Sequence, residues 1–397
     1  MGGQPPCVLG GGVIGLTCAF YLGRAGLKVT VLERDRLGSG ASRGNAGEVC
    51  PDLVEPLGAP GVAAKALSGL FRPESPLWIN PVPNVRLLRF LARLGLNSTA
   101  RRYDAGVASL AALAEDTFAL FEELEALGVD GGAEKDGFLF AYASYEAAAH
   151  GVAAFRRLGA PVATEGVLAA SALAEAEPTL GPAARAGFLV ERQWSLDPGR
   201  FVDSLAERLR RRCRAGGGRA RVTAVREGAG RVEVRTTAGT YGTDQVVVAS
   251  GVWSREICRS LGVDIDLAPG KGYSSKVRVA GTMEFDRDPD HFRQSRVDVI
   301  VAAARPYLPE ADWDHREQEW MGPRPMTTDG LPLIGPLPGH PGVVLATGHN
   351  MLGLMPAPVT GRLVTGLLVG KPDDSLTPGF APGRAVRRGL GPSAGRV

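Results

Sequence analysis

Near its amino end the chain reads CVLGGGVIGLTCAFYLGRAGLKVTVLE, from Cys7 to Glu33. The run Cys7-Val8-Leu9 is short and apolar, as is typical of a buried parallel strand. Glycines with the GxGxxG spacing follow, and apolar residues then recur every four positions up to Gly26, which predicts a helix and its end. Residues 27–32 predict a second strand. The sequence therefore predicts a strand, a glycine turn, a helix and a strand in direct succession.

The glycines of this motif have distinct physical tasks. Gly10 permits a tight turn, Gly12 lets a pyrophosphate approach the backbone, and Gly15 permits close packing of helix on strand. Free N–H groups and the positive end of the helix then face the phosphates. Glu33 ends the second strand, where a carboxylate accepts hydrogen bonds from a ribose 2′-OH and repels the 2′-phosphate of NADP. The alternative is a glycine-rich turn in an ordinary α/β unit.

Composition limits the class of protein. The 397 residues are 44% hydrophobic and 22% charged, which excludes disorder for most of the chain, collagen and a coiled coil. A net charge of +3 is too balanced to indicate a nucleic-acid partner. Five cysteines without a CxxC pair indicate no disulfide framework, no metal site and a reducing, cytoplasmic compartment. The apolar stretch 7–22 is interrupted by glycines, so we expect neither a signal peptide nor a transmembrane segment.

The sequence resembles the D-amino-acid oxidase superfamily of FAD oxidoreductases and, within it, the D-amino-acid dehydrogenase branch. Four further blocks carry the resemblance: GSGASRGNAG (38–47), RVTAV (221–225), QVVVASGVWS (245–254), and GPRPMTTDGLPLIG (322–335) continuing into VVLATGHNMLGL (343–354). The resemblance implies FAD as the cofactor. It also implies an α/β fold, in which a Rossmann-like FAD-binding domain of the glutathione-reductase type is interleaved with an α+β substrate domain built on an antiparallel sheet.

The expected domain boundaries follow from the order of these blocks. Residues 1–85, 146–255 and 321–380 are assigned to the FAD-binding domain, and 86–145 and 256–320 to the substrate domain. Residues 381–397, rich in Gly, Pro, Ala and Arg, are expected to be a disordered tail. One long helix is predicted over 104–127. The basic run 208–214 is interpreted as a solvated helix end, with contact to anionic lipid or nucleic acid as the alternative.

The glycine motif and the resemblance together give a set of candidate cofactor-binding residues. They are Gly10, Gly12, Val13, Ile14, Gly15, Glu33, Arg34, Ser39, Ala41, Ser42, Asn45, Ala46, Gly47, Val222, Val225, Ala249, Ser250, Gly251, Trp253, Arg324, Gly348, His349, Asn350, Met351, Leu352, Gly353 and Leu354.

Three residues are candidates for catalysis. An amino acid needs a fixed cation for its carboxylate, and the guanidinium fork of Arg324 suits that task. By resemblance, His349 lies near the flavin ring, where we expect contacts rather than proton transfer, and Tyr273 lies on a strand that borders the substrate cavity. A helix after Pro356 is expected to direct its positive end at the flavin, stabilising negative charge on the reduced ring.

The implied reaction is oxidation of the Cα–N bond of an amino acid. Hydride transfer to flavin N5 gives an imine and then a 2-oxo acid, with a quinone, O2 or another acceptor taking the electrons. The alternatives are a secondary-amine oxidase of the glycine or sarcosine oxidase type, a flavoprotein acting on a bulky or carrier-bound amine in a biosynthetic pathway, and a non-catalytic flavoprotein. Peripheral contact with the inner face of a membrane is left open.

Two departures from the branch bear on the substrate. Relatives carry an aromatic residue where this chain has Glu48. In addition, the strand around Tyr273 is nearly fused to the passage that ends at Glu284, where relatives have room for a hairpin. The second departure predicts a more open or differently covered substrate site, or loss of turnover.

Overall fold

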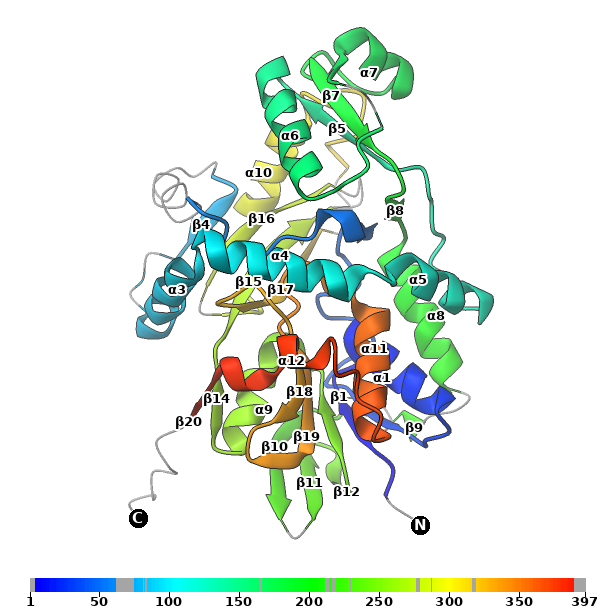
Figure 1. The fold of residues 1–397 in the computed structure, drawn as a ribbon, viewed down its shortest axis with the longest axis vertical. Coiled ribbons are helices and arrows are strands. Elements are labelled where there is room, and N and C mark those ends of the chain that lie inside the picture. The colour runs from blue at the N-terminus through cyan, green and yellow to red at the C-terminus, as the bar shows by residue number, and fades with distance from the viewer. Residues whose placement is uncertain are drawn as a thin grey trace.

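The computed structural model describes residues 4–61, 75–80, 82, 84–163, 166–210, 214–215, 219–228, 230–275, 279–286, 288–315 and 319–388. Figure 1 shows a six-stranded sheet in the lower half, a four-stranded sheet above it and a small sheet at the top. The chain passes between the lower and middle parts several times, as an interleaved arrangement requires. The α/β fold class predicted from the sequence is confirmed.

The six-stranded sheet has the strand order β18-β19-β13-β1-β2-β9. Its neighbours pair in parallel, except that β18 is antiparallel to β19. The strands are β1 (Cys7–Leu9), β2 (Thr30–Leu32), β9 (Arg214–Ala215), β13 (Val246–Val248), β18 (Leu333–Leu337) and β19 (His340–Thr347). Parallel strands end at one edge of the sheet, so the residues that follow β1, β2, β13 and β19 gather there.

Both faces of this sheet are covered, which explains its continuous apolar strands. Helices α1 (Val13–Arg24), α5 (Thr117–Ala126), α8 (Pro198–Arg210) and α11 (Ala357–Leu368) share a core with one face. The other face packs on α9 (Ser254–Ser260) and on the sheet of β10 (Val222–Gly228), β11 (Arg231–Thr236) and β12 (Gly239–Thr243). The 3₁₀ helix η2 (Gly251–Trp253) links β13 to α9. The helices predicted after Gly12 and after Pro356 are thus both present.

The four-stranded sheet is the antiparallel platform expected of a substrate domain. Its order is β17-β15-β16-β4, where β15 pairs antiparallel with both neighbours and β4 pairs in parallel with β16. The strands are β4 (Leu77–Ile79), β15 (Leu267–Ser274), β16 (Ala280–Phe285) and β17 (Trp320–Thr327), with α3 (Val85–Asn97) and α10 (Gln294–Ala304) packed against them. Ser274 pairs with Ala280, so β15 and β16 are joined directly; residues 276–278 of the connection lie outside the described residues.

The small sheet at the top of Figure 1 has the order β5-β7-β6. Its elements are β5 (Phe138–Tyr142), β6 (Leu168–Ala169) and β7 (Ala186–Val190), with α6 (Tyr145–Arg157) and α7 (Ala170–Ala176) beside them. The pair β3 (Glu48–Val49) and β8 (Trp194–Ser195), and the 3₁₀ helix η1 (Pro51–Leu53), connect it to the centre. The domain boundary predicted between 145 and 146 divides this sheet, because β5 pairs with β7.

The single helix predicted over 104–127 is wrong. The chain forms α4 (Ala100–Ala114) and α5, separated at Glu115 and Asp116. The two helices pack on different partners, α4 on η1 and α5 on α11, and Figure 1 shows them running in different directions. The apolar spacing continues across the break, so the spacing alone does not reveal it. Gly128, which follows the C-cap residue Leu127 of α5, has a φ of 80°, a conformation that commonly terminates helices.

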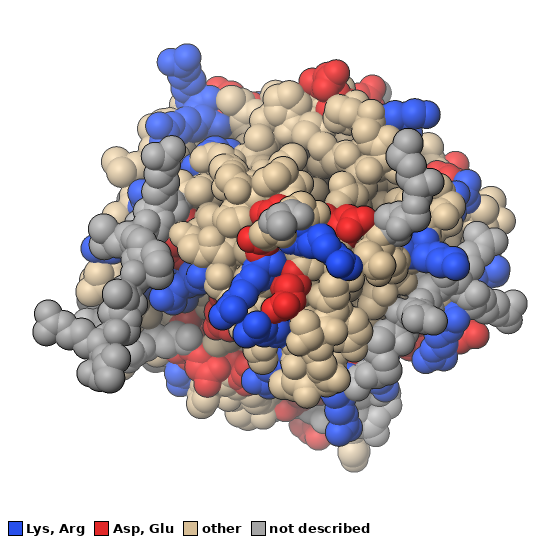
Figure 2. Space-filling model, turned by 90° about the horizontal axis from the view of Figure 1, so that it is seen from below, with Lys and Arg blue, Asp and Glu red and all other residues tan. Residues whose placement is uncertain are grey.

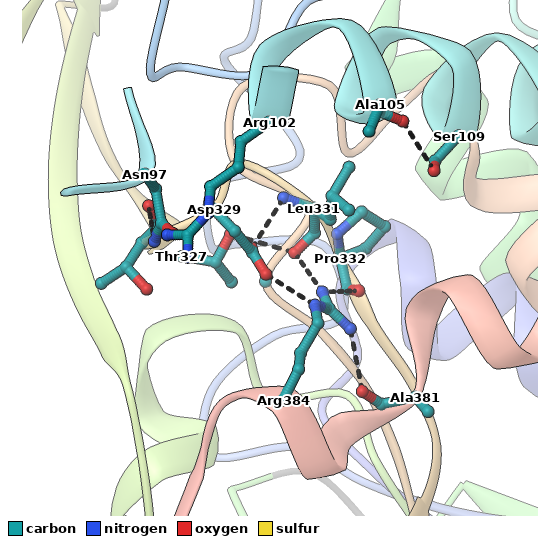
Figure 3. Close-up of polar contacts among 12 residues, drawn as sticks. Asn97, Arg102, Ala105, Ser109, Thr327, Asp329, Leu331, Pro332, Ala381 and Arg384 are labelled. Atoms are coloured by element: carbon teal, nitrogen blue, oxygen red, sulfur yellow. Dashed lines mark hydrogen bonds and ion pairs between the residues drawn. The ribbon is translucent and has the colours of Figure 1, made fainter. Parts of the chain in front are cut away.

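The disordered tail predicted from residue 381 is wrong over its first part. After α12 (Thr377–Phe380), η3 (Pro382–Arg384) leads into β20 (Val386–Arg388), which pairs with β14 (Val263–Ile265). Figure 3 shows the cause: Arg384 donates to Asp329 at 2.7 Å and to the carbonyls of Leu331, Pro332 and Ala381. The Arg384 side chain thus fixes this stretch of low-complexity composition to the loop between β17 and β18. Residues 389–397 lie outside the described residues.

Charge is mixed on the lower end of the molecule. Figure 2 shows basic and acidic side chains interspersed over this face, in keeping with the balanced net charge. In the described part of the chain, none of the helices has the length and apolar character needed to cross a bilayer.

Candidate active site

A cleft of about 1320 Å³ opens where the parallel strands of the six-stranded sheet end. Its lining comes from the loops after β1, β2, β13 and β19, from β15–β17, and from β5 and α6. Pockets for single small ligands usually measure about 300–1,000 Å³. The cleft is therefore large enough for an extended dinucleotide together with a second small molecule.

The phosphate end of the cleft is formed by the glycine turn and the first turn of α1. Gly10 has a φ of 110°, and a methyl group at Gly15 would collide with the carbonyl oxygen of Gly10. The N–H of Val13 donates to Ser42 Oγ at 2.9 Å, which brings the loop 38–47 onto the helix start. A side chain on Gly12 would approach the same hydroxyl. The turn thus leaves open the space that a pyrophosphate needs, as the motif predicts.

Glu33 holds the turn as well as lining the cleft. Its Oε2 accepts the N–H of Gly11 at 2.6 Å, and its Oε1 accepts the N–H of Asp35 at 3.0 Å. Each carboxylate oxygen accepts up to two hydrogen bonds. Glu33 therefore retains the capacity to accept a ribose hydroxyl.

Another part of the cleft lining is formed by Arg34, Trp253 and Asp290. Arg34 lies 3.7 Å above the centroid of the Trp253 ring and pairs with Asp290 at 3.2 Å. Val222 also lines the cleft, whereas the Val225 side chain is fully buried in the core beneath β10. Val225 thus supports the strand from behind, and its side chain does not line the cleft.

At the opposite end the loop 348–355 is fixed to β17 through Asn350. The Asn350 side chain accepts the N–H of Thr327 at 2.9 Å and donates to the carbonyl of Gly348 at 2.8 Å. Both Gly348 and Asn350 have positive φ, of 75° and 52°, so the chain turns sharply there before α11 begins. The expected approach of the α11 amino end to the cleft is in keeping with Leu352 to Met355, which line the cleft and lead into that helix.

His349 is buried and unsuited to proton transfer. Its Nε2 is 3.0 Å from Thr360 Oγ1, and burial lowers its pKa to about 3. The imidazole is therefore neutral near neutral pH, so it serves as a hydrogen-bonding group at this end of the cleft.

Arg324 is presented to the cleft by β17. Its guanidinium lies against Gly272 of β15, where a side chain would collide with it, and its Nη1 donates to the carbonyl of Thr282 at 3.0 Å. Thr282 adopts a φ of 57°, a strained conformation for a β-branched residue, next to an irregularity in the β15–β16 register. Burial lowers the pKa of Arg324 to about 10, while Glu48 acts in the opposite direction, so the guanidinium stays protonated at neutral pH. Within the described ranges, no carboxylate forms an ion pair with Arg324.

Tyr273 lines the cleft, but its side chain is buried against residues of α10. The hydroxyl donates to Glu284 Oε2 at 2.8 Å, and burial together with this bond raises the pKa of Tyr273. Glu284 in turn pairs with Lys271 at 2.7 Å, and both side chains are fully buried. A proton-transfer role for Tyr273 is therefore not supported by this arrangement.

Comparisons with known proteins agree with this geometry. The family model "FAD dependent oxidoreductase" matches residues 7–280 and 274–367. A D-amino acid dehydrogenase of Cereibacter sphaeroides is 31% identical over 92% of this chain and 91% of its own, and one of Sinorhizobium medicae is 30% identical over 91% and 95%. This chain belongs to the FAD-dependent oxidoreductase family.

Solved structures share the fold of this FAD-dependent oxidoreductase. Glycine oxidase from Bacillus cereus has a TM-score of 0.69 at 19% identity, with 95% of this chain and 98% of that chain covered. Iminodiacetate oxidase from a Chelativorans species has a TM-score of 0.70 at 18% identity, with the same coverage. These similarities concern the fold, which is that of FAD-dependent oxidases.

Most of the predicted site residues of this FAD-dependent oxidoreductase line one cleft, from Gly10 at one end of the sequence to Leu354 at the other. Four do not: Gly15, Gly47, Val225 and Gly348, which shape the backbone or fill the core beneath the lining. The assignment of individual residues to FAD remains a prediction.

Sequence reasoning missed several lining residues. Trp320 covers Gly44 and Gly322, so its indole packs against the second phosphate loop and β17. A wall from β5 and α6 was also missed, comprising Phe138, Leu139, Phe140, Ala154, Phe155 and Leu158. A tryptophan directly before the Gly322-Pro323-Arg324 run could have drawn attention to Trp320. No spacing links β5 to the cleft, because tertiary packing alone brings it there.

Proposed function

We propose that this protein is an FAD-dependent D-amino acid dehydrogenase, which oxidises the Cα–N bond of an amino acid to an imine that water converts to a 2-oxo acid. The observation that carries the proposal is Arg324: a guanidinium facing the cleft beside the expected flavin end, held by a single backbone carbonyl and Gly272. The dehydrogenase relatives, matched over most of their length, support the same reaction.

Bound FAD would supply the two-electron, hydride-accepting chemistry. The chain would hold it through the glycine turn, Ser42, Glu33 and the Trp253 end of the cleft. Arg324 would bind the substrate carboxylate in a bidentate pair, which fixes the Cα–H direction. His349 stays neutral and keeps the loop 348–355 in place.

The wall formed by β5 and α6 supports an apolar side chain on the substrate. Leu53 packs with Phe140 and Phe155, whose ring centroids are 4.6 Å apart, and all three line the cleft. A large apolar group transferred to such a wall gains about 25 cal/mol for each Å² that it buries. We therefore expect large apolar amino acids to have higher kcat/KM than glycine or aspartate.

Anaerobic bleaching of the bound flavin tests the function. D-amino acids should bleach it while their L-enantiomers should not, and reoxidation in air should be slow and form little hydrogen peroxide. In Arg324→Leu, KM should rise by about 10²-fold, since a charged hydrogen-bonded pair contributes roughly 1.5–3 kcal/mol, while the flavin stays bound. An unchanged KM, or bleaching by amines that lack a carboxylate, would contradict the proposal.

A further inference from the structure

Glu48 places a carboxylate in the wall of the same cleft as Arg324, close enough for the two charges to interact. It lies on β3, where it pairs with Ser195 of β8, while the next residue, Val49, is fully buried in the core. Successive side chains of a strand point to opposite faces. Glu48 is therefore directed away from the core and lines the cleft, as does Arg324.

The Glu48 carboxylate and the Arg324 guanidinium line the same cleft but do not form an ion pair with each other. Burial raises the pKa of Glu48, and the Arg324 charge partly opposes that shift. The other titratable group facing Glu48 is the Cys50 thiol on the same segment, whose pKa is raised to about 12, first by burial and then by the Glu48 charge. In the part of the chain that the structure describes, neither Glu48 nor Arg324 has an ion-pair partner within 4.0 Å.

The Glu48 carboxylate is exposed to the cleft and the Arg324 guanidinium is half-buried, and two such separated opposite charges favour a ligand that carries both complementary charges. A charge taken out of water is costly unless it is paired and hydrogen-bonded. A zwitterionic amino acid has a carboxylate for Arg324 and an ammonium for Glu48. A carboxylic acid, a hydroxy acid or a simple amine would leave one of the two charges unpaired.

We propose that Glu48 binds the amino group of the substrate while Arg324 binds its carboxylate, and that Glu48 accepts the ammonium proton before oxidation. This inference rests on the proposed function. In the step, an N–H bond of the ammonium breaks and an O–H bond forms on Glu48. The nitrogen lone pair then forms the C=N bond as the Cα–H hydrogen leaves with its electron pair for the bound FAD. Glu48 is thus the specificity-determining residue for the amine.

The proposed binding role of Glu48 can be tested apart from turnover with an amino acid that binds but cannot be oxidised. 2-Aminoisobutyrate is a zwitterion without a Cα–H, and isobutyrate is the same molecule without the amine. Each is titrated into the FAD-loaded protein at pH 7.5, with Kd measured by the change in flavin absorbance and by calorimetry. The wild type should bind 2-aminoisobutyrate about 10-fold or more tightly than isobutyrate, the range expected for one charged hydrogen bond.

In Glu48→Gln the preference should fall to near one, while isobutyrate binds at least as tightly as before. The matched control is Glu55→Gln, which changes a cleft-lining carboxylate on the same segment that is held by the Tyr103 hydroxyl; it should keep the wild-type preference. Wild-type affinity for 2-aminoisobutyrate should also weaken as the pH falls through the pKa of Glu48, and this pH dependence should disappear in Glu48→Gln.

The outcomes separate the two proposals. If D-amino acids bleach the flavin but Glu48→Gln keeps the wild-type preference, amino acid oxidation stands and the role of Glu48 is overturned. If the wild type binds neither ligand and no amino acid bleaches the flavin, both proposals are overturned.

Discussion

The six-stranded sheet and the four-stranded sheet are stabilised by different kinds of interaction. The strands of the six-stranded sheet are apolar and, among the side chains that the structure describes there, no charged one is buried, while Val8, Val247 and Leu345 are fully inaccessible. By contrast, the buried charged residues of the described chain lie in and around the four-stranded sheet: Lys271, Glu284, Asp286 and Arg296. Apolar burial depends on area and tolerates small shifts, whereas buried charges are stable only when each has its partner in place. The six-stranded sheet is therefore readable from the apolar pattern of its strands, whereas the four-stranded sheet depends on specific pairing of buried charges, which an apolar pattern does not contain.

The largest expected effect is on the charged cluster. Lys271 donates to Glu284 at 2.7 Å, to Asp286 at 3.2 Å and to the His291 carbonyl at 2.8 Å. Lys271→Met should lower the free energy of unfolding by about 3–5 kcal/mol, because it removes the fully buried cation that Glu284 and Asp286 share and leaves Arg293 as their remaining ion-pair partner among the described residues. Urea unfolding measures this. The control is Lys135→Met, at an exposed pair with Glu125, which should cost less than about 1 kcal/mol. Similar small losses of unfolding free energy for both variants would contradict the conclusion that buried ion pairs stabilise the four-stranded sheet.

The next effect concerns the glycine turn. Gly15→Ala would force α1 away from Gly10, at a cost of about 1–3 kcal/mol in stability, the range for an overfilled core, together with weaker FAD binding. Gly23→Ala is the matched change in the same helix, where nothing lies near the added methyl group. It should stabilise the protein by about 0.5–1 kcal/mol, since alanine is the better helix former. Thermal unfolding and FAD titration compare the two variants. Equal stability and equal FAD affinity would contradict the conclusion that close packing requires glycine at position 15.

A smaller effect is expected at the carboxyl end. Arg384→Ala should cost about 1–2 kcal/mol, because it removes the bonds to Asp329 and to the carbonyls of Leu331 and Ala381. Amide exchange over β20 should become faster, as measured by mass spectrometry. Arg210→Ala, at an exposed pair with Glu207, serves as the control and should leave that exchange unchanged. Fast exchange over β20 in the wild type would instead favour the disordered tail expected from composition.

The smallest effect is the pH dependence of stability at Glu48. Desolvation in the cleft raises its pKa in the folded protein, so folding disfavours the ionised carboxylate; this penalty is complete above the folded-state pKa and disappears below the lower pKa of the unfolded chain. Glu48→Gln should therefore have a slightly higher Tm than the wild type at pH 8, and the difference should shrink as the pH falls through that pKa. Calorimetric scans of the FAD-loaded proteins from pH 4 to pH 8 measure it. A Tm difference that grows toward low pH would contradict the sign.

Much of the site could be predicted because its parts are short and locally constrained. Gly10, Glu33 and Arg324 each belong to a motif whose residue types are dictated by a neighbouring backbone or ligand. The break between α4 and α5, the order of residues 382–388 and the Phe140–Phe155 wall could not be predicted in this way. Each depends on partners more than a hundred residues away or on a direction of packing that periodicity does not contain.

The sequence by itself determined the glycine turn and the strand, helix and strand around it, because these elements lie together within residues 7–33 and their residue types are set by local turn geometry and burial. Only the tertiary structure decided how Tyr273, Arg324 and Glu48 are used. The Tyr273 hydroxyl is turned toward Glu284, and the Arg324 guanidinium and the Glu48 carboxylate are brought to the same cleft without forming an ion pair. Those outcomes depend on which charges meet when distant strands pair, and the energy of a charge is set by its surroundings rather than by its position in the sequence.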